Sequence, residues 1–413
     1  MKQQKSYKNF VIIFFLGISS GLPLALILST LKAFLLERGF DLKTIGFFSL
    51  VSLPYTIKFC FAPIIDSCSI PFLTRILGQR KSWIIITQIA LAISIFALGI
   101  AGLTNDLAAI ATFAFLVAFA SASQDIVIDG YRIELIKKED QGLAASFYVY
   151  GYRIGMLISG AGALGLAEII SWDSIYFIMA GLALSTVLIT IFADETRKNF
   201  QQKSHNFSSW IKQSVVDPFV DFTHRKQWYT ILAFIIFFKL GDVFAGNLTL
   251  PFLLEVGFSK IEIASIVKTF GLFATLFGVF IGGILVKKLG VNKSLWIAAF
   301  LQMSSNLTFS YLAQVGYSPK ILYLVIFIEN FSGGIGDAVF VAYLSSLCSS
   351  AFSATQYAVL VSFATFSRSL LTSSAGMFAE TLGWYKFFIL STFLALPGII
   401  FLLLITRKIL RKN

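Results

Sequence analysis

The sequence predicts an all-α membrane protein in which twelve transmembrane helices form two pseudo-symmetric six-helix bundles. Two observations set the class: 57% of the 413 residues are hydrophobic and only 13% are charged, and the mean hydropathy is +0.82. This composition is typical of a chain whose main solvent is lipid. The third observation is a set of motifs that occur once in each half of the chain, which predicts the two bundles.

Twelve apolar runs are each close to the roughly 20 residues that a spanning helix needs. They cover approximately residues 9–36, 45–65, 83–104, 107–130, 143–169, 174–193, 229–256, 261–286, 295–315, 320–347, 355–380 and 386–406. A polar stretch follows the sixth run, and its middle has the pattern of a short amphipathic helix on the membrane surface. We therefore expect an N-terminal six-helix bundle over residues 1–195, a cytoplasmic linker over 196–228 and a C-terminal six-helix bundle over 229–413.

Three pairs of motifs relate the two halves. The spacing Phe-x5-Asp-x-Val-x3-Tyr occurs at residues 119–131 and again at 331–343, and residues 34–40 and 252–258 share Phe-Leu-Leu-Glu-x-Gly-Phe. A third pattern is formed by Gln141, Arg153 and Ser159 and recurs as Gln356, Arg368 and Ser374. Because six crossings return the chain to its starting side, the two bundles are expected to have the same orientation.

The net charge of +12 is explained by membrane topology rather than by nucleic-acid binding. With the N-terminus inside, 22 of the 33 Lys and Arg fall on the inner side, 5 on the outer side and 6 inside the runs. This distribution predicts that both termini are cytoplasmic. The first run is too long for the apolar core of a signal peptide and has no small-residue cleavage site, so it is expected to remain as the first helix.

No metal site, disulfide framework or cofactor is predicted. Cys60, Cys68 and Cys348 show no CxxC spacing, and His205 and His224 both lie in the linker. The runs also hold no constellation of His, Ser or Cys with a base, which argues against a membrane-embedded enzyme acting on lipid-linked sugars.

Eleven ionisable side chains fall inside the apolar runs. Facing lipid, they would together cost on the order of 30 kcal/mol on insertion scales, so they are expected to pair or to line a water-filled cavity. Asp125 and Asp129 share a helix face one turn apart, and Lys239 and Asp242 are spaced to neutralise each other. The five acids are Asp125, Asp129, Asp242, Glu329 and Asp337, and the six bases are Lys32, Lys58, Arg153, Lys239, Lys268 and Arg368.

These groups divide by expected role. Intramembrane carboxylates mark proton pathways, so we expect the five acids to serve proton coupling, and Gln124 to orient Asp125 or to bond substrate. Aromatic rings beside a guanidinium suit a sugar that carries a carboxylate; an interfacial aromatic belt is the alternative for the tyrosines. The expected substrate-binding residues are Gln124, Lys58, Tyr148, Tyr152, Arg153, Lys239, Lys268, Asn330 and Arg368.

Two further features concern the ends and the packing of the helices. Asp66 ends the second run before a loop that contains Arg75, Arg80 and Lys81. We expect Asp66 and Arg80 to form a cytoplasmic gate, with Arg75 or Lys81 as the other possible partners of Asp66; ordinary interfacial charge is the alternative. Gly17 and Gly21 form a small-xxx-small face on which another helix can pack closely, and Pro23 predicts a local break.

With these residues in place, the chain resembles the AmpG-type muropeptide permeases of the major facilitator superfamily from its first to its twelfth run. The motifs that carry the resemblance are Asp41-Leu-Lys-Thr-Ile-Gly-Phe-Phe-Ser-Leu-Val51, Lys58-Phe with Ala62-Pro63 and Asp66, Ser121-Ala-Ser-Gln-Asp-Ile-Val-Ile-Asp129, Gly151-Tyr-Arg-Ile-Gly-Met-Leu-Ile-Ser-Gly160, Lys239-Leu-Gly-Asp242, Val267-Lys-Thr269, Glu329-Asn330 with Gly333-Gly334, and Phe352-Ser-Ala-Thr-Gln356.

The resemblance implies the major facilitator fold and proton-driven import, across the bacterial inner membrane, of N-acetylglucosaminyl-anhydro-N-acetylmuramic acid and its peptides for peptidoglycan recycling. A monomer that alternates access between the two sides is expected, with the lipid bilayer and protons as its other partners. Two departures limit the transfer of gating detail: Ser67 stands where the family tends to have Arg, and some members continue with further hydrophobic segments beyond the position of Asn413.

One alternative stays open from the residues alone. A proton-coupled carrier for another anionic solute, such as acetyl-CoA, a drug or a small metabolite, would need the same cations in its cavity. Competition among labelled substrates separates the two functions.

Overall fold

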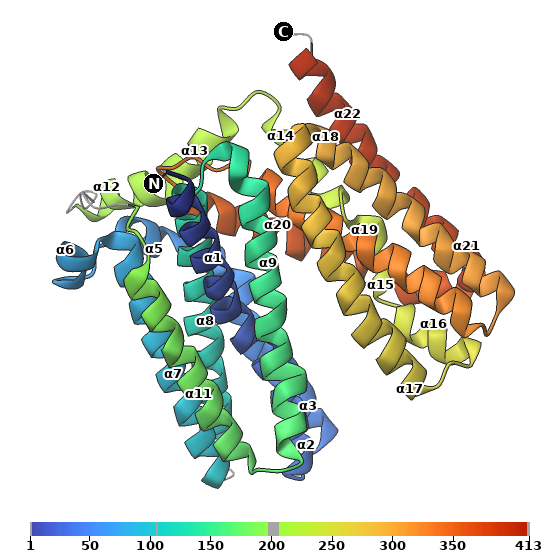
Figure 1. Ribbon diagram of the computed structural model, residues 1–413, viewed down its shortest axis with the longest axis horizontal. Coiled ribbons are helices and arrows are strands. Elements are labelled where there is room, and N and C mark those ends of the chain that lie inside the picture. The colour runs from blue at the N-terminus through green and yellow to red at the C-terminus, as the bar shows by residue number, and fades with distance from the viewer. Residues whose placement is uncertain (1, 105, 197–205, 411–413) are drawn as a thin grey trace. The chain divides into compact units, whose positions relative to one another are not determined.

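The computed structural model describes residues 2–104, 106–196 and 206–410, and every regular element in this part of the chain is a helix (Figure 1). Several of the cations counted for the topology lie outside the described residues, or have side chains that do: Lys2, Lys5, Arg197, Lys198, Lys203, Lys408, Arg411 and Lys412. His205 of the linker lies outside them as well.

The chain forms two compact units. Unit 1 consists of Met1–Lys137, Phe147–Phe219 and Cys348–Ser362, and unit 2 of Lys138–Ser146, Val220–Leu347 and Phe363–Asn413. The main change of unit thus falls inside the predicted linker. Two short segments belong to the opposite unit from their predicted half. Residues 348–362 belong to unit 1 because they bond to its side chains, and residues 138–146 belong to unit 2 because they pack against one of its helices.

The helices of unit 1 follow the first six predicted runs. They are α1 (Lys2–Ala25) with α2 (Leu31–Glu37); α3 (Leu42–Phe47), α4 (Leu53–Ile57) and α5 (Ala62–Ser67); α6 (Leu73–Leu77); α7 (Gln79–Thr104); α8 (Leu107–Leu135); α9 (Gln141–Leu157) with α10 (Ala163–Ala167); and α11 (Trp172–Phe192). The linker contributes α12 (Phe207–Ile211) and α13 (Asp217–Thr223), and the first turns of α20 (Ser353–Thr372) complete the unit.

Proline residues explain where these helices break, and glycine residues explain where two of them pack closely. Pro54 and Pro63 each stand in the first turn of a short helix, where a missing N–H costs nothing, and they divide the second run into short pieces. The predicted small-residue face is confirmed. A Cβ at Gly17 would meet the carbonyl of Tyr148, and a Cβ at Gly151 would meet that of Phe14, so α1 and α9 pack backbone to backbone.

Unit 2 contains the helices of the second half. They are α14 (Trp228–Phe237), α15 (Leu240–Gly246) and α16 (Thr249–Val256); α17 (Lys260–Ile263) and α18 (Gly271–Val315); α19 (Pro319–Ser346); the rest of α20; α21 (Ala375–Phe393); and α22 (Leu396–Leu410). Gly290 and Gly383 interrupt α18 and α21 with φ values of 77° and 71°, a conformation that favours glycine, so each label covers two helical segments.

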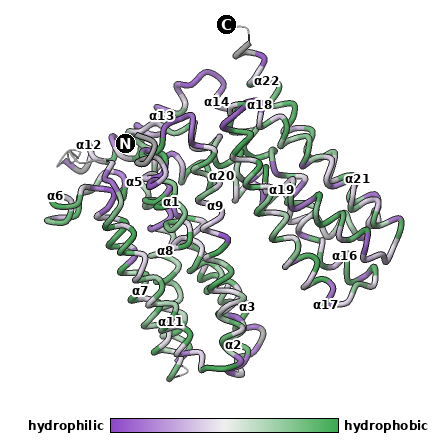
Figure 2. Tube along the Cα trace, viewed as in Figure 1, coloured by the Kyte–Doolittle hydropathy of each residue, from purple (hydrophilic) through white to green (hydrophobic). Residues whose placement is uncertain are grey.

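Eight helices among the described residues are long and apolar enough to cross a membrane. Figure 2 shows that hydrophobic residues cover the long helices, whereas hydrophilic residues gather at their ends and along α12 and α13. Each unit has an aromatic core: Phe34 packs edge to face on Trp172 and Tyr176 in unit 1, and Phe252 and Phe388 pack together in unit 2. Large apolar side chains remain exposed on the outer faces, as expected for helices in lipid.

Candidate functional site

The acidic face of α8 lies inside unit 1. Asp125 and Asp129 are 7% and 5% exposed, and Lys58, which follows α4, is 8% exposed and acts electrostatically on both carboxylates. Asp129 also pairs with Arg132 at 3.3 Å. Oδ1 of Asp125, in contrast, is buried and has no hydrogen-bond partner in the described part of the chain. Asp125 is therefore the less engaged of the two carboxylates.

Arg132 is one of the 22 cations counted on the inner side, and it is a buried side chain rather than an exposed surface charge. It is fully buried, and its guanidinium lies over two rings, 5.5 Å from the centroid of Tyr148 and 5.4 Å from that of Tyr357. The helix continues past the predicted end of the run to Leu135, which keeps Arg132 within hydrogen-bonding reach of Asp129. Such stacking stabilises a desolvated guanidinium.

The predicted aromatic face of α9 is present. The rings of Tyr148 and Tyr152 lie 6.2 Å apart, Tyr148 being buried and Tyr152 half-buried, and Arg153 is half-buried beside them. Tyr152 and Arg153 act electrostatically on each other, and Tyr152 also on Asp125. Rings, cations and carboxylates thus share one region of unit 1, a combination that suits a polar, charged ligand.

The expected hydrogen bond from Gln124 to Asp125 does not form in the described part of the chain, because the amide of Gln124 points at another helix. It is fully buried and donates from Nε2 to Oγ of Ser19 on α1 at 3.0 Å. Ser19 in turn bonds Thr186 of α11 at 2.9 Å, and Thr190 bonds Gln88 of α7 at 2.9 Å. This network joins four helices, so the structure favours a packing role for Gln124 over a substrate contact.

In unit 2, the expected pair of Lys239 with Asp242 is replaced by a pair of Lys239 with Asp337 of α19. Lys239 lies in the break between α14 and α15, where its φ and ψ of −109° and 11° leave the helical region, so the three-residue spacing no longer directs it to Asp242. Asp242 instead accepts from Gln302 at 3.4 Å. Arg368 lies over the ring of Phe340, 5.7 Å from its centroid, and acts electrostatically on both acids.

The remaining predicted residues of unit 2 lie in different surroundings. Asn330 donates to Glu329 at 2.8 Å and accepts from Thr275 of α18 at 3.0 Å, which makes a polar patch between α18 and α19. Lys268 is exposed in the wide turn that precedes α18, and Lys32 is exposed on α2. Neither exposed lysine joins the buried clusters, which fits side chains that extend to the membrane surface.

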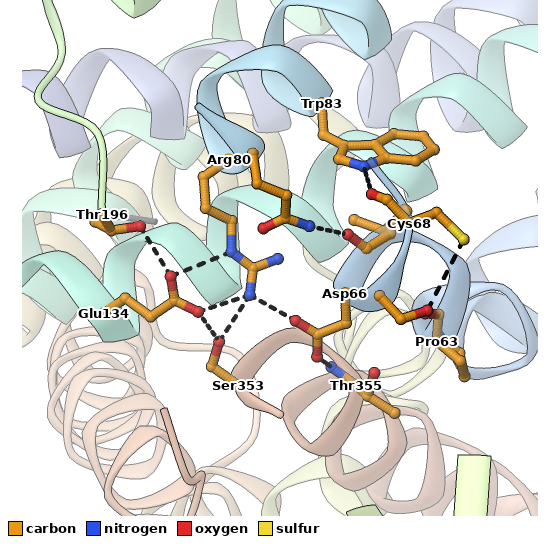
Figure 3. Close-up of polar contacts among 12 residues, drawn as sticks. Pro63, Asp66, Cys68, Arg80, Trp83, Glu134, Thr196, Ser353 and Thr355 are labelled. Atoms are coloured by element: carbon orange, nitrogen blue, oxygen red, sulfur yellow. Dashed lines mark hydrogen bonds and ion pairs between the residues drawn. The ribbon is translucent and has the colours of Figure 1, made fainter. Parts of the chain in front are cut away.

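The second charged cluster surrounds Arg80 at the start of α7 (Figure 3). Its Nη2 lies 2.6 Å from Asp66 of α5 and 2.6 Å from Glu134 of α8, and it also donates to Oγ of Ser353 at 3.0 Å. Arg80 is fully buried, and the side chains of Asp66 and Glu134 are 3% and 6% exposed. The predicted contact of Asp66 with Arg80 therefore forms as a buried pair, which ordinary interfacial charge would not do.

The cluster also holds the start of α20 and the linker. Asp66 accepts from the backbone N–H of Thr355 at 2.9 Å, so its carboxylate lies at the positive end of α20 (Figure 3). Glu195, just after α11, accepts from the backbone N–H groups of Arg80 and Lys81 at 3.3 and 2.8 Å. Trp210 of α12 donates to Ser67 at 2.9 Å. Thr196, at the start of the linker, donates to Oε2 of Glu134 at 2.8 Å, so the linker is bonded to the cluster itself (Figure 3).

Segment 138–146 of unit 2 makes a different kind of contact. Oγ of Ser146 donates to the carbonyl of Val279 on α18 at 2.8 Å, and a Cβ at Gly283 would collide with that hydroxyl. Lys287 and Asp140 form an ion pair here at 3.3 Å, and their side chains are 53% and 28% exposed. Unit 1 therefore binds the start of α20 with buried charge, whereas unit 2 binds the start of α9 by close packing.

Sequence reasoning missed several members of these clusters: Arg132, Glu134, Glu195, Gln302, Ser353 and Tyr357. Glu134 and Arg132 lie one or two turns beyond the acidic face of α8, so a longer helix would have included them. Among the described residues, no group of three or more His, Cys, Asp or Glu could hold a metal ion.

Comparisons with known proteins agree with this picture. Residues 13–372 match the family model of the Major Facilitator Superfamily. The chain is 39% identical over 401 residues to the "Anhydromuropeptide permease" of Escherichia coli (strain K12), which covers 97% of this chain and 80% of that protein. It is 38% identical over 409 residues to "Putative transporter AmpG 4" of Rickettsia conorii (strain ATCC VR-613 / Malish 7), with 98% of both chains covered.

Solved structures show the same fold at low identity. The human organic anion transporter MFSD10 (TETRAN) superposes with a TM-score of 0.72 at 13% identity, covering 96% of this chain and 99% of that one. The transporter FucP in the outward conformation gives a TM-score of 0.68 at 13% identity, covering 95% and 97%.

Proposed function

The chain belongs to the major facilitator superfamily, and from that premise we propose that it is a bacterial inner-membrane permease that imports muropeptides for peptidoglycan recycling. The proposed substrate is N-acetylglucosaminyl-anhydro-N-acetylmuramic acid with or without peptide. The observation that carries the proposal is the 39% identity to the anhydromuropeptide permease, because the match covers 97% of this chain and so includes the helices with the buried clusters.

The chemistry of unit 1 supports a sugar that bears carboxylates. Tyr148 and Tyr152 offer ring faces to a pyranose, and Lys58 and Arg153 offer positive charge to the lactyl and peptide carboxylates. In unit 2, Nη1 of Arg368 is buried without a hydrogen-bond partner among the described residues, and we propose Arg368 as a cation for substrate carboxylates. Lys239 is already paired with Asp337, so its role is better described as holding that acid than as binding substrate.

We propose Asp125, before the other acids, as the residue that carries the coupling proton. Asp129 and Asp337 each have a cationic partner, whereas Oδ1 of Asp125 has no hydrogen-bond partner in the part of the chain that the structure describes. A carboxylate without a fixed partner can lose and regain a proton without breaking an ion pair. Lys58 acts on Asp125, so a substrate anion that binds Lys58 would change the proton affinity of Asp125.

The proposal includes twelve membrane crossings with both termini in the cytoplasm. The eight long apolar helices of the described residues become ten when two of them are divided at Gly290 and Gly383, and the broken helices over 42–67 and 141–167 bring the number to twelve, which supports that count. We also propose that a monomer works by alternating access, and that the Arg80 cluster, formed by Asp66, Arg80, Glu134 and Ser353, is a cytoplasmic latch that must open in each cycle. Its buried charges favour a contact that is either fully made or fully broken.

Uptake into membrane vesicles tests the function. Labelled anhydro-muropeptide is offered with and without an imposed inward proton gradient, and we expect accumulation that depends on that gradient. Unlabelled acetyl-CoA, or another small anion, at excess should not compete. Uptake that is insensitive to the gradient would refute proton coupling, and effective competition by the unrelated anion would favour the alternative carrier function.

A further inference from the structure

A buried glutamine on α18 directs its amide at one of the carboxylates of unit 2. Gln302 is 3% exposed, and its Nε2 donates to Oδ2 of Asp242 at 3.4 Å. Its Oε1 is buried and accepts no hydrogen bond from the described residues. Oε1 of Gln124, to which the structure gives a packing role, is likewise buried without a partner among the described residues, so the feature that distinguishes Gln302 is that its donor group reaches a carboxylate.

Gly336 of α19 makes room for this contact. A Cβ at this position would lie 2.5 Å from both Cδ and Nε2 of Gln302, so any larger residue would displace the amide. The repeated spacing of residues 119–131 and 331–343 places Gly336 where the first half has Gln124. One half therefore fills this position with its own glutamine, and the other leaves it open for a glutamine from the neighbouring helix.

Gln88 of α7 shows what a glutamine with a packing role looks like in the same protein. Its Oε1 accepts from Thr190 at 2.9 Å, and its Nε2 lies 3.4 Å from the carbonyl of Thr186 and 3.5 Å from Oγ of Ser19. Both ends of that amide are used, and these three partners of Gln88 are uncharged. Gln88 is thus a matched control for Gln302.

The other charged groups that act on Asp242 come from three places. Lys239 precedes α15, Asp337 and Glu329 lie on α19, and Arg368 lies on α20. Lys239 is already held by Asp337, and Arg368 lies over the ring of Phe340. Among the described residues, Gln302 is therefore the side chain that donates a hydrogen bond to the Asp242 carboxylate.

We propose that Gln302 is a positioning residue that donates to ionised Asp242 and sets the pH at which this carboxylate takes up its proton. The proposal rests on the proposed function only in placing Asp242 among the coupling acids. When the donor is lost, the ionised form of Asp242 is less stabilised, so the proton is retained to higher pH. Loss of one hydrogen bond to a charged acceptor corresponds to a shift of about one pH unit.

Infrared difference spectra of the purified full chain at a series of pH values test this without any substrate. The carbonyl stretch of a protonated carboxylic acid that disappears in Asp242→Asn identifies Asp242. We expect its midpoint to rise by about one pH unit in Gln302→Leu, and to rise also in Gly336→Ala, which keeps the glutamine but displaces its amide. Gln88→Leu should leave the midpoint unchanged.

A midpoint that is the same in Gln302→Leu and in the parent protein, or an Asp242 band that is absent at every pH, overturns the proposal. Gradient-driven uptake provides the second readout: Gln302→Leu should move the pH optimum in the same direction, leave the substrate KM within about twofold, and add nothing in an Asp242→Asn background. If Gln302→Leu shows the infrared shift but the parent protein takes up no muropeptide, the proposed function fails and the role of Gln302 stands.

Discussion

Replacing Arg80 by Met gives the sharpest test of the buried cluster at the start of α7. The substitution keeps an unbranched apolar stem as far as the position of Nε and removes the cation that lies 2.6 Å from both Asp66 and Glu134. Two carboxylates, 3% and 6% exposed, then remain without their main partner. Removing one partner from a buried ion pair costs about 3 to 5 kcal/mol, which is a large part of the roughly 5 to 15 kcal/mol that stabilises a folded domain.

Two assays measure the effect. Unfolding in mixed micelles, followed by tryptophan fluorescence, should show the loss of free energy directly. In a variant without Cys60 and Cys68, alkylation of Cys348 from the cytoplasmic side should become faster, because Cys348 begins the segment that the cluster holds. A change of about 3 kcal/mol corresponds to more than a hundredfold in the population of the open contact.

A neighbouring lysine and a charge-neutral variant provide the controls. The Nζ of Lys81 donates to the carbonyl of Ile191 in an exposed contact, so Lys81→Met should change stability by less than about 1 kcal/mol. Adding Asp66→Asn and Glu134→Gln to Arg80→Met should recover most of the lost stability, since no buried charge is then unpaired. The reasoning is refuted if Arg80→Met is as stable as Lys81→Met and Cys348 reacts at the parent rate.

Three further predictions concern the helices. Asp125→Asn should abolish gradient-driven accumulation while solute exchange is partly retained, and undiminished accumulation in vesicles would exclude Asp125 as the proton carrier. Lys239→Met and Asp337→Asn should each reduce uptake strongly. The double variant should recover expression and thermal stability, because it leaves no unpaired charge. A loss of melting temperature in the double variant that equals the sum of the two single losses would contradict the pairing. Gly151→Ala should lower the stability by about 1 to 3 kcal/mol, because its Cβ meets the carbonyl of Phe14, while Gly165→Ala, with open space around it, should be nearly neutral in the same thermal unfolding assay.

Much of the site could be predicted from residue type and spacing. Asp125, Asp129 and Lys58 are buried together, as expected for charged side chains that cannot face lipid. The sequence limits the partner of Asp66 to the cations of the loop that contains Arg80, because a carboxylate at the end of an apolar helix needs a cation nearby. The structure shows that this cation is Arg80. Long-range partners such as Ser353 and Thr355 could not be found this way, because they are separated from Asp66 by nearly the whole chain.

By itself the sequence determined the class of protein, the positions of the apolar runs, the repeated motifs and the charged residues that lipid would exclude, because these follow from composition and from the period of a single helix. The tertiary structure alone decided which side chain each of these residues meets. A break at Lys239 turned it from Asp242 to Asp337, an uninterrupted α8 buried Arg132 beside Asp129, and the missing side chain of Gly336 admitted Gln302 to Asp242. Helical periodicity defines the face on which a residue lies, but the packing of neighbouring helices defines what lies opposite that face.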